Sequence, residues 1–166
     1  MGRRYARAES LRAVAKLRAF DPEFAVTTDV IVGYPGETEE DFELTRSLMD
    51  EAGFDNAFVF KYSPRPGTRS AAWPDDVPAT EKERRDQVLL ADQNARGQRR
   101  NDALVGTRRA VLAEGPSPRN ASRWCGRDSG NRIVVFEPPA RALAPGEKVE
   151  TGIVSARPQT LVARVP

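Results

Sequence analysis

The spacing of apolar residues changes once along this chain, near residue 104, and this change limits the folds that the chain can adopt. Up to residue 62, stretches with apolar residues three and four apart alternate with short runs rich in β-branched residues. After residue 104, short apolar runs follow one another with Gly, Pro and Asp-Ser-Gly turns between them. Because helices and strands have different periods, the first part is predicted to be α/β and the last part all-β.

The first part is predicted to fold in the order helix, strand, helix, strand. Residues 7–20 have the spacing of an amphipathic helix, and residues 25–33 (AVTTDVIVG) are typical of a buried strand in a parallel sheet. Thr38 is a suitable N-cap for a second helix, which Gly53 should end. Residues 56–62 (NAFVFKY) are predicted to form a second buried strand.

This order is typical of a βα-barrel or a doubly wound sheet, but two strands complete neither of them. We therefore expect a partial barrel that is cut from something larger. Without the remaining strands, the apolar side chains at residues 30–32 and 58–60 should be exposed.

A charged segment connects the two parts. Residues 71–78 (AAWPDDVP) are a Pro-rich connector, and Thr80 caps a long helix in which apolar positions are sparse. We predict an exposed bridging helix. The predicted division is residues 1–78 for the partial barrel, residues 79–103 for the helix and residues 104–166 for the all-β part.

The last part contains five predicted strands, with the sequences RRAVLAEG, SRWCGR, NRIVVFE, EKVETGIVSA and TLVARV. Turn residues separate them at 115–116, 128–130, 138–139 and 145–146. Five short strands with regular turns predict a small closed β-barrel of OB-like size.

Composition excludes several kinds of site. The chain has one cysteine and no histidine, so an intrachain disulfide, a histidine general base and a metal site with several Cys or His ligands are impossible. No apolar run approaches the ~18 residues of a membrane span, and the N-terminal segment has no signal-peptide core. We expect a cytoplasmic protein without a membrane partner.

Arginine is clustered at residues 96–109 and again at residues 119–132, although the net charge is only +2. Such clusters could follow a phosphate backbone, or they could be a solvated surface. Charge alone favours the second interpretation.

Three stretches in order carry a family resemblance: TTDVIVGYPGETEEDF (27–42), FKYSPRPGT (60–68) and VLAEGPSPRN with GRDSGNRIVVF (within 111–136). They resemble the MiaB-type radical-SAM methylthiotransferases, and the opening MGRRYAR is similar to the start of a helix in the middle of that family's barrel. The family methylthiolates C2 of N6-isopentenyladenosine next to the tRNA anticodon.

The resemblance implies an α/β partial radical-SAM (βα) barrel followed by a small all-β TRAM barrel. It also implies S-adenosyl-L-methionine (SAM) and two 4Fe-4S clusters as cofactors. The family holds its radical-SAM cluster on a CxxxCxxC loop, and this chain has only Cys125. We therefore expect no metal ligand and no catalytic residue here, and an isolated chain without activity.

The resemblance places Ile31, Gly33 and Glu37 beside the adenosine of SAM. A simple strand-to-helix turn is the alternative for this segment. Polar residues before the strand's apolar core could contact SAM or only one another, and Arg65 lies between two prolines that would present its guanidinium to a carboxylate or phosphate. The predicted SAM-binding set is Thr28, Asp29, Ile31, Gly33, Glu37 and Arg65.

The basic tail supplies the predicted RNA contacts, because small β-barrels bind RNA through loops that carry such residues. Trp124 and Phe136 could stack on bases, but the core is their more common location, and Cys125 is predicted to be half-buried. The predicted RNA-binding set is Arg119, Asn120, Arg123, Arg127, Asn131 and Arg132.

The resemblance implies tRNA, SAM and a sulfur donor as partners, and we expect a monomer. Two alternatives remain open. A related enzyme methylthiolates a ribosomal protein, and its TRAM domain would bind protein. The chain could also be a stand-alone RNA-binding module.

Overall fold

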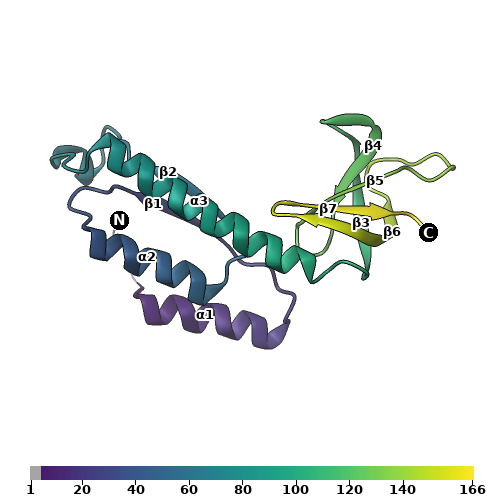
Figure 1. Ribbon diagram of the computed structural model, residues 1–166, viewed down its shortest axis with the longest axis horizontal. Helices are drawn as coiled ribbons and strands as arrows, with labels where there is room; N and C mark the ends of the chain where they lie inside the picture. The colour runs from purple at the N-terminus through teal and green to yellow at the C-terminus, as the bar shows by residue number, and fades with distance from the viewer. Residues whose placement is uncertain (1–4) are drawn as a thin grey trace. The chain divides into compact units, whose positions relative to one another are not determined.

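The computed structural model describes residues 5–166, which form two compact units, one up to Gln93 and one from Asn94 to Pro166 (Figure 1). The first four residues of the MGRRYAR segment lie outside the described residues. Among residues 5–166, no helix is long and apolar enough to cross a membrane.

The first unit is built around two parallel strands. Helix α1 (Arg7–Phe20) precedes β1 (Thr27–Val32), and α2 (Glu39–Ala52) connects β1 to β2 (Asn56–Lys61). The strands pair in parallel, from Thr27 opposite Asn56 to Val32 opposite Lys61. The predicted helix, strand, helix and strand are therefore confirmed, and the first strand begins two residues later than expected.

The core of this unit lies between one face of the two strands and the helices. Val32 and Phe42 are fully buried there together with Leu89 of α3 (Ala79–Asp102), and Val14 of α1 joins the same cluster. The expectation that residues 30–32 expose an apolar face was wrong for the valines, because α2 and α3 cover Val30 and Val32.

The other face of the sheet is open. Phe58 and Phe60 are each 53% exposed, as the sequence predicted, so β2 is not the fully buried strand that its apolar composition suggested. In a parallel pair, residues in register share a face, which places Asp29 beside Phe58 and Ile31 beside Phe60. This open face thus carries two aromatic rings, an isoleucine and a carboxylate.

The expected ends of α2 are confirmed. The Asp41 backbone N–H donates to Thr38 Oγ1 (3.2 Å), and the Thr38 N–H donates to Asp41 Oδ2 (3.0 Å). The Thr38 hydroxyl also donates to Asp41 Oδ2 (2.8 Å), and the hydrogen bonds from the Thr38 backbone and hydroxyl to this carboxylate lower the pKa of Asp41. Gly53 ends the helix in the left-handed conformation.

Helix α3 is not the exposed bridge that its sequence suggested. Lys82, Arg85 and Asp86 are buried with Leu89 on one side of its first turns. Charged residues can be buried when carboxylates or amides pair with them, and long side chains also bury their aliphatic stems. The scarcity of apolar residues therefore did not indicate exposure.

In its last turns, α3 belongs to the second unit and packs against that unit's final hairpin. The Asn101 side-chain amide donates to the backbone carbonyls of Arg157 (2.8 Å) and Pro158 (3.2 Å). At Gly97 a Cβ atom would lie 2.4 Å from the Pro158 carbonyl oxygen. The glycine thus allows the helix to approach the hairpin backbone closely.

The second unit is the predicted five-stranded closed barrel. Its strands are β3 (Arg108–Ser117), β4 (Asn120–Arg127), β5 (Ile133–Phe136), β6 (Lys148–Arg157) and β7 (Thr160–Arg164). They close in the order β3-β4-β5-β7-β6, with only β5 and β7 parallel. The core contains the fully or almost fully buried Val111, Val134, Phe136 and Leu161, so the prediction that Phe136 is a core residue is confirmed.

The prediction of a turn at Gly115-Pro116 was wrong, because β3 continues to Ser117. Ala113 pairs with Gly126 and Gly115 with Cys125, so Glu114 is the extra residue of a β-bulge. Gly115 has φ +141°, a conformation that suits glycine. The reversal lies instead at Pro118-Arg119, between the paired Ser117 and Asn120.

Candidate nucleic-acid interface and the turn after β1

A buried ion pair holds the turn after β1. The Gly33 N–H donates to Glu37 Oε2 (2.6 Å), and Arg85 Nη1 donates to the same oxygen (2.6 Å). The Glu37 and Arg85 side chains are only 10% and 5% exposed. Burial lowers the pKa of Arg85, but hydrogen bonds to Glu37 and Glu81 outweigh it and leave the pKa raised. Arg85 therefore stays charged.

Gly33 has no tolerance for a side chain. Its φ is +69°, and a Cβ atom would lie 2.3 Å from Lys82 Cγ. The ammonium of Lys82 pairs with Asp75 (2.5 Å) and lies 5.3 Å from the centre of the Tyr62 ring. The turn, the Pro-rich connector and α3 are thus fixed to one another.

Aromatic rings hold the connector against the same turn. Tyr34 contacts Tyr62 and Trp73 edge to face, with ring centres 5.1 and 6.0 Å apart. The Gly36 N–H donates to Asp76 Oδ1 (2.8 Å). The first residues after β1 therefore pack against residues 73–76.

The predicted SAM-binding residues do not form one cluster. Asp29 and Ile31 lie on the open face of the sheet, whereas Thr28 pairs with the buried Ala57 and points to the helix side. Gly33 is buried beneath Lys82. Glu37 is occupied by the buried ion pair with Arg85.

Arg65 lies in an ordered loop with its side chain exposed. The backbone N–H and the hydroxyl of Thr68 both donate to the Arg65 carbonyl, at 3.2 and 2.8 Å. Among residues 5–166, no carboxylate pairs with the Arg65 guanidinium. It is thus available to an anionic ligand.

The predicted RNA-binding residues all lie on β4 or on the loops at its ends. Arg119 is exposed in the β3–β4 turn. Asn120 Oδ1 accepts bonds from the N–H and hydroxyl of Ser122 (3.0 and 2.7 Å). Arg123 lies 3.7 Å from Glu137, a longer separation than a good charge-assisted hydrogen bond.

The loop after β4 uses its polar residues internally. Arg127 donates to Glu114 (3.0 Å) and to the carbonyl and side chain of Asn131 (both 3.2 Å). Arg132 pairs with the almost fully buried Asp128 (3.1 Å) and is itself only 13% exposed. Arg132 therefore stabilises this loop, while Arg127 keeps an exposed position.

The strand register reveals three exposed arginines that the sequence did not single out. Arg108, Gly152 and Arg164 lie in one row across β3, β6 and β7 on the outside of the barrel. Arg157 lies in another outer row, opposite Thr160. Their positions depend on pairing between distant strands, so only the register could identify them.

Between these rows lies a row without charge. Cys125, Val135 and Val162 are aligned across β4, β5 and β7 and are half-buried on the outer face. Burial, and then the nearby Glu114, raise the pKa of the Cys125 thiol. Trp124 points the other way, because it pairs with Phe136 and packs on the core.

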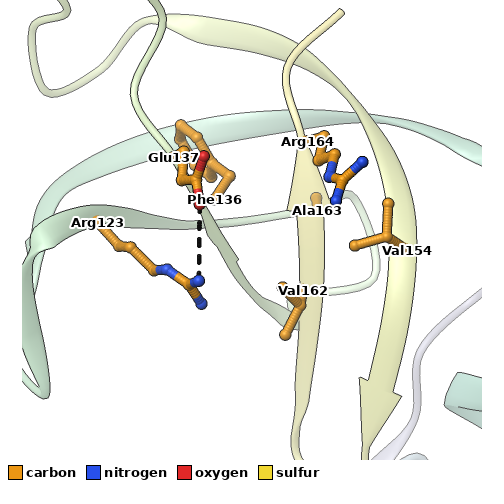
Figure 2. Close-up of a pocket in the computed structure, with 7 residues that line it drawn as sticks. All are labelled: Arg123, Phe136, Glu137, Val154, Val162, Ala163 and Arg164. Carbon is orange, nitrogen blue, oxygen red and sulfur yellow. Dashed lines mark ion pairs between the residues drawn. The ribbon is translucent and has the colours of Figure 1, made fainter.

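A hollow of about 110 Å³ opens on this outer face at the C-terminal ends of β5 and β7, beside Val154 of β6. Figure 2 shows Val162 between Arg123 and Arg164, Val154 on the far side of Arg164, and Glu137 paired with Arg123. An apolar floor between two guanidiniums can hold an apolar flat group that carries negative charge at its edge.

Comparisons with known proteins agree with this architecture. Residues 102–165 match the family model described as "TRAM domain". The chain is 46% identical over 165 residues to a tRNA-2-methylthio-N(6)-dimethylallyladenosine synthase of Bordetella petrii, covering 99% of this chain and 34% of that protein. The chain is therefore similar to one part of this synthase.

Synthases of the same name from two other organisms give a similar result. The Akkermansia muciniphila protein is 46% identical over 137 residues, which cover 82% of this chain and 30% of that protein. The Coxiella burnetii protein is 40% identical over 161 residues, which cover 97% of this chain and 36% of that protein. The chain thus spans about a third of the length of these relatives.

Proposed function

We propose that this chain acts in tRNA modification, as the C-terminal part of an enzyme that methylthiolates C2 of N6-isopentenyladenosine beside the anticodon. The names of the relatives and the TRAM match support this proposal. The reaction would take place in the cytoplasm with SAM and a sulfur donor, and we expect the protein to be a monomer.

The iron-sulfur clusters do not fit the residues of this chain. Its one cysteine lies half-buried on the outside of the barrel, with no second thiol to share a cluster. Among residues 5–166, no group of three His, Cys, Asp or Glu side chains could hold a metal ion. The chain alone should therefore have no methylthiotransferase activity.

The first unit would contribute a wall of the SAM pocket. In this proposal its open face, with Asp29 and Ile31 next to Phe58 and Phe60, would be the inside of a partial radical-SAM barrel. Bound SAM supplies the methyl group and the radical source of the family's reaction. Asp29 could accept hydrogen bonds from SAM and Ile31 could pack beside its adenine, while Arg65 could bind its carboxylate. Gly33, buried beneath Lys82, would instead shape the turn at the edge of the pocket.

Thr28 and Glu37 fit SAM contact less well. Thr28 lies on the helix side of β1, and the Glu37 carboxylate is buried against Arg85. We propose that Glu37 acts as a positioning residue, which keeps the Gly33 turn in shape for the ligand.

The barrel would bind the tRNA, and its exposed arginines carry this proposal. Arg119 has no carboxylate partner among the described residues, and Arg123 and Arg127 remain 40% and 41% exposed in their ion pairs. Phosphate contacts of this kind fix the position of RNA without reading its sequence. Asn120, Asn131 and Arg132 shape the two loops that present these arginines.

Alanine variants test this assignment. Titration of unmodified tRNA should give about tenfold weaker binding for the Arg119→Ala/Arg123→Ala/Arg127→Ala variant, because each lost phosphate contact weakens binding for all sequences. Arg141→Ala is the matched control, since Arg141 is also an exposed arginine of this unit in an ion pair, with Glu147 (2.7 Å). Equal affinities of wild type and triple variant would refute the proposed loops.

A stand-alone RNA-binding module is the second candidate, because the barrel is closed and has its own core. The two candidates differ in their need for another polypeptide. Addition of the cluster-bearing part of a related synthase should restore methylthiolation of tRNA if this chain is an enzyme part. Binding of tRNA without any restored reaction would favour the module.

A further inference from the structure

The hollow between Arg123 and Arg164 on the barrel combines an apolar floor with two guanidiniums, of which Arg123 is paired with Glu137. Its volume of about 110 Å³ is well below the roughly 300–1,000 Å³ of small-molecule pockets. A free metabolite of the size of SAM would remain mostly outside it. The hollow is better suited to one group that projects from a larger ligand.

The floor of the hollow is made by two outward-facing valines. Val154, at the bulge in β6, is 45% exposed, and Val162 on β7 lies beside it in the hollow. An apolar floor contributes to binding only if the ligand offers an apolar face. In duplex RNA the base faces are stacked on one another, whereas an unpaired base has a free face.

The charges at the rim suit the phosphates on either side of such a base. Arg164 has no acidic partner among residues 5–166, and across Gly152, which has no side chain, it aligns with Arg108. Arg123 is held only weakly, because its partner Glu137 is 3.7 Å away and 75% exposed. A phosphate could therefore recruit Arg123 at little cost.

Glu137 is the one negative group at the rim, and it need not repel the ligand. A carboxylate accepts hydrogen bonds from the exocyclic amino group of a base. With Arg123 bound to a phosphate, Glu137 would be free to accept such a bond. The two residues thus match the two chemical parts of one nucleotide.

We infer that this hollow binds a single unpaired nucleotide of RNA, with its base on Val154 and Val162 and its flanking phosphates on Arg164 and Arg123. This inference rests on the proposed tRNA binding and adds to it a preference for unpaired over paired RNA. It also assigns RNA contacts to Arg164 and Val154, which lie outside the loops proposed above to bind tRNA.

The test compares binding of a labelled RNA single strand of about eight nucleotides with binding of a hairpin duplex. The length lies within the range that one OB-like barrel covers. The variants are Arg164→Ala and Val154→Asp in the whole chain. Val105→Asp is the matched control, because Val105 is a 44% exposed valine of the same unit that does not line the hollow.

Wild type should prefer the single strand. Arg164→Ala and Val154→Asp should each weaken its binding about fivefold or more, while Val105→Asp stays within about twofold. Arg164→Ala should also reduce the salt slope by about one. Circular dichroism verifies that each variant is folded, and Arg164→Ala alone suffices if Val154→Asp fails to fold.

Two results would overturn the inference in distinguishable ways. If wild type binds tRNA but Val154→Asp behaves as Val105→Asp and Arg164→Ala behaves as wild type, the hollow is not the nucleotide site and the loop assignment survives. If wild type binds neither tRNA nor the single strand, the proposed RNA binding fails together with the inference.

Discussion

Replacing Arg85 with methionine should strongly destabilise the first unit. Arg85 donates to the carboxylates of Glu37 (2.6 Å) and Glu81 (2.7 Å) and also to the Glu37 carbonyl (3.1 Å). Methionine would leave the buried Glu37 carboxylate with only the Gly33 N–H. Removing one partner of a buried ion pair costs roughly 3–5 kcal/mol.

That cost is large compared with the total stability. At about 0.05–0.15 kcal/mol per residue, a unit of this size has roughly 5–14 kcal/mol. With a urea dependence near 2 kcal/mol per molar, the midpoint should fall by about 2 M. Glu37→Gln should cost less, about 1–2 kcal/mol, because Arg85 keeps Glu81 and Glu39 as partners.

Tryptophan fluorescence can follow each unit separately, since Trp73 lies in the first unit and Trp124 in the second. In a Trp124→Phe background, urea titration reports the first unit alone. Arg84→Met is the control, because Arg84 also pairs with two carboxylates but is 45% exposed, and exposed pairs contribute about 0–1 kcal/mol. Equally small losses of unfolding free energy in Arg85→Met and Arg84→Met would refute this reasoning.

Three further predictions concern the same unit. Gly33→Ala should lower the urea midpoint of the first unit, followed by Trp73 fluorescence, more than Gly36→Ala does. Both glycines have positive φ, but only at Gly33 would an added Cβ atom clash with Lys82, at 2.3 Å. Equal shifts of the midpoint would contradict this. Hydrogen bonds from Arg84 and Arg85 lower the pKa of Glu81 from 4.5 to about 2, so the stabilisation by Glu81 is full above pH 4.5 and is lost as the pH falls towards 2. The difference in unfolding free energy between wild type and Glu81→Gln should shrink across that window, and a constant difference would disprove the effect. Phe58→Ser/Phe60→Ser should reduce binding of a hydrophobic dye such as ANS by at least about half, because these rings form the open face; unchanged dye binding would mean that this face is covered.

Capping residues, turn residues and short apolar runs in the sequence predicted most of the helices and strands. The Thr-Glu-Glu-Asp segment that begins at Thr38 forms the expected cap, and Gly53 ends α2 as expected. Short apolar runs separated by turn residues after residue 104 predicted the five strands. These features depend on residues within a few positions of one another.

Features that depend on distant residues could not be predicted from the sequence. Glu37 and Arg85 are 48 positions apart, and the sequence of α3 shows many charges without showing which of them are buried. The alignment of Arg164 with Arg108 requires the register of three strands. The predicted SAM and RNA residues came from motifs, so their local positions were available but their partners were not.

The salt dependence of tRNA binding tests the central claim, that the barrel holds RNA by its phosphates, most directly. Three to five arginine contacts predict that log K falls with log salt concentration with a slope of about −2 to −4.5. The slope should become less negative in the Arg119→Ala/Arg123→Ala/Arg127→Ala variant. Affinity that does not change between about 50 and 200 mM salt, or an absence of tRNA binding, would contradict the account.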